Sequence, residues 1–296
     1  MILPLTTNFK KKYYVNMTIF NEKHFLKHLE EFTDVYLSSP IKDNAGGMGF
    51  NHSYFTYFVF KELQPQLAVE SGVWRGHSTY IIESASPDSQ IISLDPYPNN
   101  IIYKSNNAKY FDTDFNCIDW LSFDGVDDSL CFFDDHQNSL ERLKEMKWWG
   151  FKRAIFEDNF PSGEGDSYSL KQIINKSGHP NIQLSKKYLP KTRKKIKERK
   201  IEEEVLNKFY FRQSMIVKPN SIDKSGFNLN VKYIQEFPPL HTNEISYWGH
   251  KWVGDYKKSE NLMNSENVNE FPKFKKYLEK NQDSSDYGFI TYLELT

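Results

Sequence analysis

The chain has 296 residues, of which 39% are hydrophobic and 26% charged, a composition typical of a globular protein and not of a disordered or membrane protein. Its formal net charge of −1 argues against nucleic acid as a partner. No apolar stretch could span a bilayer or form a signal peptide, and the two cysteines form no CxxC pair, so we expect a soluble, cytoplasmic protein.

The first part of the chain predicts two helices. Residues 19–37 repeat apolar positions at three- and four-residue intervals, which indicates an amphipathic helix. After a break at residues 44–48, residues 51–64 predict a second helix with Asn51 as its N-cap. We expect residues 1–64 to form an N-terminal helical cap and residues 65–296 to form the main domain.

Strand and helix patterns alternate from residue 66 onward. The expected strands are residues 66–70, 90–95, 129–133 and 152–157, and the expected helices are residues 77–85 and 138–149. We count these strands as the first, second, fourth and fifth of the sheet, because a third strand is expected to end at Asp112 and Asp114. Short, continuously apolar strands separated by helices indicate parallel βαβ units covered on both faces. The fold class is therefore expected to be α/β, with a Rossmann-like, doubly wound and mostly parallel sheet.

The pattern changes after residue 159. Residues 161–210 predict a lid-like helical insertion, and residues 185–200 within it carry nine basic residues in sixteen. That basic segment fits a solvated, salt-bridged helix, or a lid that faces an anionic substrate. Residues 209–217, 230–237 and 288–294 predict strands, and we expect the last two to pair and finish the sheet.

A glycine turn follows the first expected strand, with the pattern Glu70-x-Gly72-x-x-x-Gly76. Gly72 permits a tight turn, and Gly76 lets the backbone approach a ligand closely. Ser78 and Thr79 open the next helix, where free amides favour a negative group. Glu70 would repel a pyrophosphate but can pair with a cationic ligand, such as the amino group of S-adenosylmethionine (SAM).

Further acids follow the second and third expected strands. Asp95 closes the second strand about twenty residues after the glycines, a position suited to accept both ribose hydroxyls of a nucleotide. Asp112 and Asp114 follow the third strand, where Asp114 is the candidate to approach the adenine unless both acids are merely solvated. The same Asp-x-Asp pattern occurs in metal-dependent glycosyltransferases, where it holds a nucleotide sugar diphosphate.

Acidic groups also end the fourth and fifth expected strands, in the segments FFDDHQ (132–137) and IFEDNFP (155–161). Parallel strands end at one edge of a sheet, where ligands bind. The residues expected to meet there are Asp134, Asp135, His136, Glu157, Asp158 and Asn159. Crowded carboxylates repel unless a proton or cation compensates, and oxygen donors suit Mg²⁺ or another divalent cation. His136 is either a general base or a structural histidine bonded to a carboxylate.

The segment VESGVWRGHST is similar to the E-x-G-V-[YFW]-x-G-G-S-T turn of the cephalosporin hydroxylase-like and macrolide sugar O-methyltransferase families. From about residue 44 to residue 159 the chain resembles a class I SAM-dependent methyltransferase. The resemblance implies that the turn, including Trp74, wraps the methionine end of the cofactor. Trp74 occupies the central position of the turn, and the chain departs from the pattern at His77, which replaces a second glycine.

The resemblance also implies a metal-dependent O-methyltransferase. The pattern of the catechol enzymes puts Asp135, Asp158 and Asn159 on the metal, whereas the pattern of the sugar enzymes favours Asp135, Glu157 and Asp158. Asp134 is the rival of Asp135, because neighbouring residues of a strand point in opposite directions.

The expected function is transfer of a methyl group from SAM to a hydroxyl, assisted by Mg²⁺, with Asp135 and His136 as catalytic residues. The acceptor is expected to be a small molecule or glycan, and a sugar is favoured over a phenol because aromatic residues and histidines recur at 236–242 and 246–252. The alternatives are a glycosyltransferase that uses Asp112 and Asp114, and a non-catalytic scaffold with a methyltransferase-like fold. Both a monomer and a homo-oligomer are compatible with the sequence.

Overall fold

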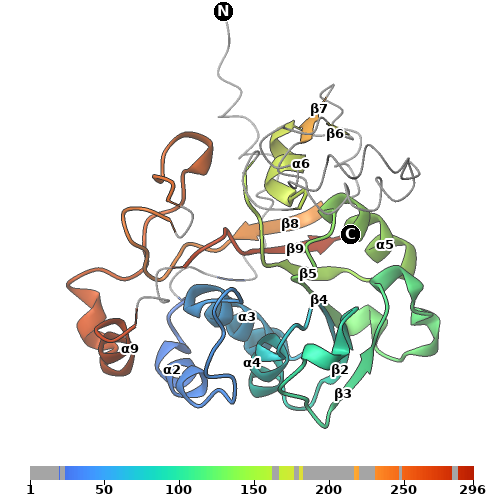
Figure 1. Cartoon of the computed structure of the whole chain (residues 1–296), viewed down its shortest axis with the longest axis horizontal. Helices are drawn as coiled ribbons and strands as arrows, with labels where there is room; N and C mark the ends of the chain where they lie inside the picture. Colours follow the sequence, from blue (N-terminus) through green and yellow to red (C-terminus); the bar gives the residue numbers. More distant parts are fainter. Residues whose placement is uncertain are drawn as a thin grey trace, which may run out of the picture.

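The computed structural model describes residues 20, 24–161, 167–176, 180–182, 217–219, 231–246, 249–281 and 286–296 (Figure 1). The helices in this part are α2 (Leu29–Leu37), α3 (Phe50–Leu63), α4 (His77–Ala85), α5 (Ser139–Trp149), α6 (Leu170–Lys176) and α9 (Pro272–Leu278). The strands are β1 (Leu67–Ser71), β2 (Gln90–Leu94), β3 (Ala108–Phe111), β4 (Ser129–Phe133), β5 (Arg153–Phe156), β6 (Pro180–Ile182), β7 (Val217–Pro219), β8 (Val231–Glu236) and β9 (Thr291–Leu295).

Seven strands form one sheet in the order β3-β2-β1-β4-β5-β9-β8. The first five strands of that order pair in parallel, whereas β9 is antiparallel to both β5 and β8. The predicted Rossmann-like, doubly wound and mostly parallel sheet is thus confirmed, as is the pairing of the last two strands. The strand order reverses between β1 and β4, which is where open α/β sheets bind their ligands, beyond the carboxyl ends of the strands.

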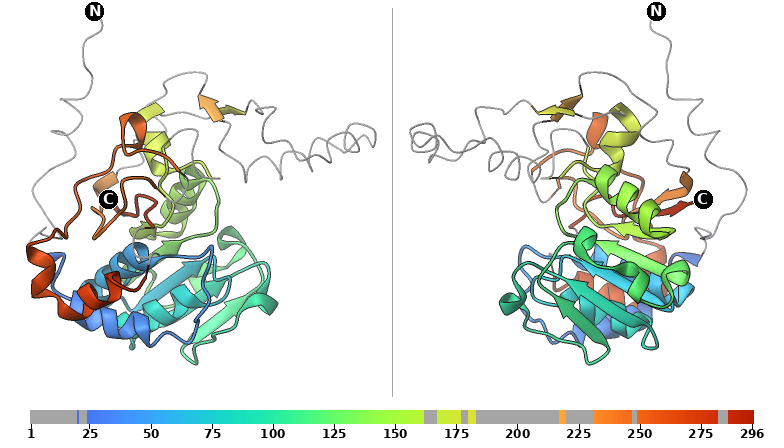
Figure 2. Two further views of the ribbon diagram at one scale, coloured as in Figure 1. Left: turned by 60° about the vertical axis from the view of Figure 1, so that its left-hand side comes forward. Right: turned by 90° about the vertical axis from the view of Figure 1, so that its right-hand side faces the viewer.

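Both faces of the sheet are covered, because successive strand residues point to opposite sides. On β1, Ala68 packs in a cluster with α3 and α4, whereas Val69 packs in a second cluster with α5 and α6. Phe132 and Phe133 divide in the same way on β4. Figures 1 and 2 show these helices on the two sides of the sheet.

Helix α3 is buried on all sides from Phe50 to Phe60, as expected for a helix that is apolar around its circumference. It begins at Phe50 with Gly49 as its N-cap, so the prediction that Asn51 caps the helix is wrong. Asn51 instead donates from Nδ2 to the carbonyls of His241 and Asp286, at 2.8 and 2.9 Å. The first turn of α3 is therefore fastened to two loops from the C-terminal part of the chain.

Some predicted elements are shorter than expected or are not described. The helix expected at 19–37 is α-helical from Leu29. Of the strand expected at 209–217, only residue 217 lies in the described part, as the first residue of β7, which pairs with β6 in a separate two-stranded sheet. The basic segment 185–200 and most of the insertion at 161–210 lie outside the described residues.

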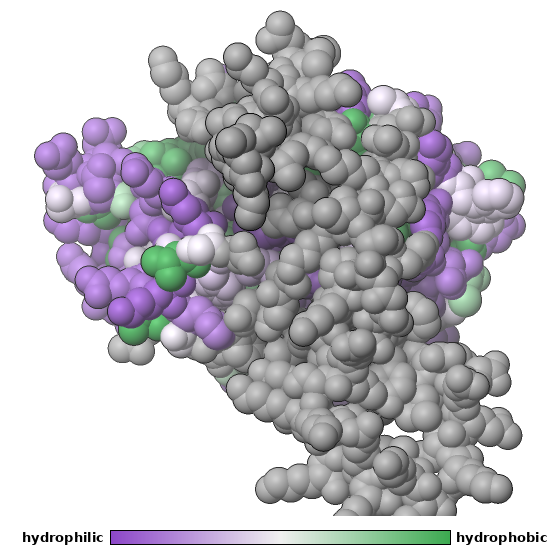
Figure 3. All heavy atoms as spheres, turned by 90° about the horizontal axis from the view of Figure 1, so that it is seen from above, coloured by the Kyte–Doolittle hydropathy of each residue, from purple (hydrophilic) through white to green (hydrophobic). Residues whose placement is uncertain are grey.

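None of the helices in the described part of the chain is both long enough and apolar enough to cross a membrane. Seen from above, the described surface is mostly hydrophilic, and its hydrophobic residues occur as separate spots (Figure 3). Scattered apolar residues of this kind are normal on a protein surface.

Candidate functional site at the carboxyl edge of the sheet

The glycine turn after β1 packs directly against backbone from two other loops. Gly72 has a φ of +94°, and a Cβ there would lie 2.1 Å from the carbonyl oxygen of Asp134. Gly76 has a φ of +92°, and its Cβ would lie 2.2 Å from the carbonyl oxygen of Tyr103. We expected Gly76 to admit a ligand, but the group that approaches it is the protein's own backbone. The turn therefore lies against the residue that follows β4.

Gly72→Ala should destabilise the protein by about 3 kcal/mol or more, because left-handed backbone strain and overpacking add together. Gly150 is a matched control, since its φ is +88° but its Cβ would meet no atom within 4 Å. Gly150→Ala should cost only the backbone strain, about 1–2 kcal/mol. Urea unfolding of the two variants measures the difference. Equal losses would show that the contact with Asp134 contributes nothing.

Glu70 lies on β1 and is completely buried. Its Oε2 accepts hydrogen bonds from Thr79, at 2.7 Å, and from Ser93, at 2.6 Å. The Ser78 hydroxyl also acts to lower the pKa of Glu70, yet Oε1 has no hydrogen bond among the described residues. Burial outweighs the three hydroxyls and raises the pKa of Glu70 above its ordinary value. A buried carboxylate oxygen beside a helix start is thus left to accept from a donor.

Glu70→Gln should change how stability depends on pH. The folded pKa of Glu70 is raised above 4.5, so the folded protein holds this proton where the unfolded chain has released it. The wild type should therefore lose stability as the pH rises from about 4.5 through the folded pKa. The Gln variant should lack this slope. Thermal unfolding from pH 4.5 to 8, without cofactor, compares the two proteins, and parallel curves would contradict the prediction.

Asp95 holds the glycine turn in place. Its Oδ2 accepts from the backbone amides of Val73, at 3.0 Å, and Trp74, at 2.7 Å, and its Oδ1 accepts from Tyr97 N at 2.7 Å. A carboxylate has about four acceptor positions, so one remains for a ligand hydroxyl. Trp74 has a φ of +46° and is 37% exposed, with the Arg75 guanidinium 4.5 Å from its ring centroid. Asp95 and Trp74 thus lie together at the turn.

A buried arginine that the sequence analysis missed organises the neighbouring loops. Arg142 on α5 forms a bidentate pair with Asp114, at 2.6 and 2.8 Å, and contacts Asp135 at 2.9 Å and Glu145 at 2.6 Å. It is 3% exposed. The carboxylate of Asp114, predicted to approach the adenine, is therefore bound to Arg142, while Asp112 is exposed. The sequence contains one signal for this ion pair: Arg142 is the only arginine of its helix and stands three residues before Glu145.

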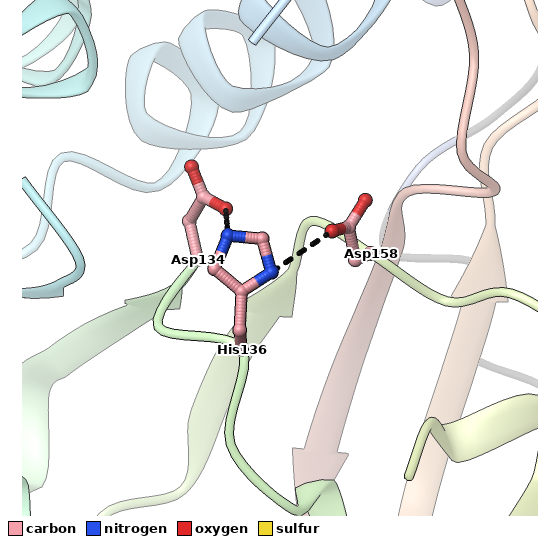
Figure 4. Close-up of side chains that lie close together, drawn as sticks. All are labelled: Asp134, His136 and Asp158. Carbon is pink, nitrogen blue, oxygen red and sulfur yellow. Dashed lines mark ion pairs between the residues drawn. The ribbon is translucent and has the colours of Figure 1, made fainter. Parts of the chain in front are cut away.

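Three side chains converge beyond the ends of β4 and β5 (Figure 4): Asp134, His136 and Asp158. Figure 4 shows the His136 ring between the two carboxylates, with Nε2 3.9 Å from Asp134 Oδ1 and Nδ1 3.5 Å from Asp158 Oδ2. One ligand atom from each residue lies within 4.8 Å of the others. The His136 side chain is 49% exposed and the two acids are about half as exposed, so ions can reach the cluster.

The other predicted metal ligands are engaged elsewhere. Asp135 was expected to bind the metal, but its carboxylate accepts hydrogen bonds from Ser71 Oγ, at 2.6 Å, and from Arg142. Its side chain therefore faces away from the cluster. Asn159 donates from Nδ2 to Thr291 Oγ1, at 2.7 Å, and accepts from Lys171 N. Asp134, the rival of Asp135, instead lies with His136 and Asp158 in the cluster, where its Oδ1 is 3.9 Å from His136 Nε2. His136 itself has a φ of +53°.

Glu157 lies beneath the cluster, paired with His52 from α3. Both side chains are buried. Burial raises the pKa of Glu157 to about 8, with a further rise from the charge of Asp134, while a hydrogen bond with Asp158 lowers it. Burial also lowers the pKa of His52. Burial thus disfavours the charged form of each partner in this pair.

The donor set suits a divalent cation, because two carboxylates and an imidazole meet at a partly exposed edge.

The glycine turn suits the cofactor that the sequence predicts, SAM. Helix α4 begins at His77 without a side-chain cap, so its first amides are open to a carboxylate. The unbonded Oε1 of Glu70 suits an amino group, and Asp95 retains an acceptor position. The glycine turn and the acidic cluster are adjacent, since Gly72 packs against the backbone of Asp134.

No protein-family model matches the chain, and no curated protein matches it. Solved structures with a partial likeness include CmcI with SAH, which is 18% identical with a TM-score of 0.31 over 41% of this chain and 68% of that chain. The SAH-bound methyltransferase PaMTH1 of Podospora anserina is 15% identical, with a TM-score of 0.31 over 53% and 72% of the two chains. An O-methyltransferase of Bacillus cereus in complex with SAH is 11% identical, with a TM-score of 0.30 over 50% and 70%. TM-scores this low carry no argument about activity.

Proposed function

We propose that the chain is a SAM-dependent O-methyltransferase that uses a divalent cation. The observation that supports this most is the contact between the glycine turn and the acidic cluster: Gly72 packs on the backbone of Asp134, whose side chain faces Asp158. Both parts lie beyond the carboxyl ends of β1, β4 and β5, at the point where the strand order reverses. A methyl donor and a hydroxyl acceptor could therefore be held side by side.

The turn and its neighbours bind the cofactor in this proposal. Glu70 Oε1 accepts from its amino group, the first amides of α4 near Ser78 and Thr79 face its carboxylate, and Asp95 accepts from its ribose. Trp74, which is 37% exposed, lies in the turn itself. When bound, SAM supplies an electrophilic methyl group. Asp114 supports this site through its ion pair with Arg142.

We assign the cation to Asp134 and Asp158, with Asp134 in place of Asp135. When bound, the cation supplies a positive charge that favours the ionised form of an acceptor hydroxyl and orients it. His136 lies beside both carboxylates and accepts the hydroxyl proton on a ring nitrogen. The residues of the turn and of the cluster hold the two reactants in line, which contributes much of the rate.

We favour a sugar hydroxyl, in a glycan or small glycoside, as the acceptor. Aromatic rings line the loops next to Asp158: Phe160 stacks with Tyr256, which stacks with the partly exposed Trp252 at a centroid distance of 5.2 Å. His250 lies 5.2 Å from the Tyr256 ring. Phe160 and Tyr256 are buried, so Trp252 and His250 are the rings that can pack on the apolar face of a sugar, as on that of a phenol. Nucleic acid is not proposed as a partner, given the net charge of −1.

The test is methyl transfer from labelled SAM to a panel of glycosides and catechols, with Mn²⁺ or Mg²⁺ and again with EDTA. Transfer that requires the cation supports the proposal, and preference for a glycoside supports the sugar acceptor. Binding of neither S-adenosylhomocysteine nor cation in calorimetry would favour the scaffold. Transfer from a labelled nucleotide sugar would favour the glycosyltransferase, although Arg142 already binds Asp114 of its Asp-x-Asp pattern.

We assign residues 65–296 to the catalytic domain and residues 1–64 to a helical cap, in a cytoplasmic protein. The cap would wall the acceptor side, because α3 packs against α4 and its first turn bonds to loops near Asp158.

A further inference from the structure

His52, on the first turn of α3, joins two loops that are distant in the sequence. Its Nδ1 contacts Glu157 Oε1, and the backbone N–H of Gly288 donates to its Nε2 at 2.6 Å. Because Nε2 accepts a hydrogen bond, the ring proton lies on Nδ1, which therefore donates to Glu157. The imidazole thus has a fixed orientation and a fixed tautomer.

These bonds close a ring around Asp158. Glu157, the residue before it, is bound by His52 Nδ1. Asn159, the residue after it, donates its backbone N–H to the carbonyl of Gly288 at 2.9 Å. Gly288 in turn donates to His52 Nε2. The backbone on both sides of Asp158 is therefore attached, directly or through one residue, to a single imidazole.

The fit around Gly288 leaves no room for adjustment. A Cβ on Gly288 would lie 2.9 Å from His52 Cε1, 2.9 Å from Phe160 Cζ and 3.1 Å from Asp158 Oδ1. His52 itself is held by a helix that is buried on all sides, and its neighbour Asn51 bonds to the carbonyls of His241 and of Asp286, the latter two residues before Gly288. The imidazole therefore transmits the position of a rigid helix to the acidic loop after β5.

We propose that His52 is the positioning residue of the cation centre: through Glu157 and Gly288 it fixes the carboxylate of Asp158 opposite Asp134. This rests on the proposed cation site. Side chains that hold metal ligands from behind typically change metal affinity by about 10–100-fold when they are replaced. His52 has no contact with the cation in this proposal, and its effect is on the geometry of a ligand.

Two substitutions separate the two bonds of the imidazole. Asn places its amide near the position of Nδ1 and can still donate to Glu157, whereas Gln places its amide near Nε2 and can accept only from Gly288. Isothermal titration with Mn²⁺, on the full chain without cofactor or acceptor, should show about 10-fold or greater loss of affinity for His52→Gln. His52→Asn should stay within about 3-fold of the wild type, a loss below that 10–100-fold range.

His28 provides the control, because its Nε2 lies 2.6 Å from Glu62 in another His–Glu pair that joins α2 to α3. His28→Gln should bind Mn²⁺ like the wild type.

If His52→Gln does not fold, Gly288→Ala replaces it and should weaken Mn²⁺ binding to the same extent. The inference is overturned if His52→Gln binds Mn²⁺ normally, if His52→Asn loses as much affinity as the Gln variant, or if the wild type binds no Mn²⁺. Absence of methyl transfer would overturn the proposed function alone, since this titration needs no turnover.

Discussion

Asp158→Ala is expected to abolish the binding of divalent cations and to slow methyl transfer by about 10²–10³-fold. The cluster would lose one of its two carboxylates, and a catalytic cation contributes several kcal/mol to the transition state, each 1.4 kcal/mol being about tenfold in rate. Asp134→Ala should have the same effect, because its carboxylate faces Asp158 across the His136 ring. Mn²⁺ titration and initial rates with labelled SAM measure the two losses separately.

Asp135→Asn is the matched control for these variants. Asp135 is adjacent to Asp134 in the sequence but accepts from Ser71 and Arg142, so this variant should keep its cation affinity within a few-fold while losing some stability. Should Asp135→Asn lose the cation while Asp134→Ala keeps it, the ligand set first expected from the sequence would be restored. If His136→Ala slows methyl transfer but still binds Mn²⁺, then His136 acts as a base and not as a metal ligand.

Arg142→Gln is expected to lower the free energy of unfolding by about 3–5 kcal/mol, the usual cost of removing one partner from a buried charge network. Asp114, Asp135 and Glu145 would remain around a side chain without charge. Burial already raises the pKa of Glu145, and Arg142 is the charge that lowers it. Without that charge the loss should be greatest near neutral pH and should shrink as the pH falls and Glu145 binds a proton. Urea unfolding at pH 7 and pH 5 tests both statements.

Arg153 provides the comparison for Arg142. It pairs with Asp128 at 2.6 Å, but the Asp128 side chain is 57% exposed, so Arg153→Gln should cost no more than about 1 kcal/mol. A loss in Arg142→Gln no larger than that in Arg153→Gln would mean that the buried network adds nothing to stability.

Most strands of the sheet were predictable because each of them is a local pattern, although no range was expected for β3 and β9 begins three residues later than expected. Continuous apolar runs such as Leu67–Ser71 and Ser129–Phe133 predict buried parallel strands, and the expected boundaries agree with the observed ones to within one or two residues. The edge at which acids would gather followed from the same reasoning, because parallel strands end together. Local patterns could not decide which acid of a neighbouring pair would face inward.

That choice depends on contacts between residues far apart in the sequence. Asp135 is drawn to Arg142, whose other partner Asp114 lies 28 residues away from it. His52 lies 105 residues from Glu157 and 236 from Gly288, so no motif could have paired them. Asn51 was expected to cap a helix because its residue type favours that role, but tertiary bonds to distant loops use its side chain.

The position of β9 has a consequence for how the chain folds during its synthesis. β9 lies between β5 and β8, with Leu293 opposite both Ala154 and Ile234. A nascent chain can assemble β1 to β5 once residue 156 has left the ribosome, but β5 then keeps an open edge until residues 291–295 emerge. An unpaired apolar edge invites association with other chains, so this interval is the time at which a chaperone would be most useful.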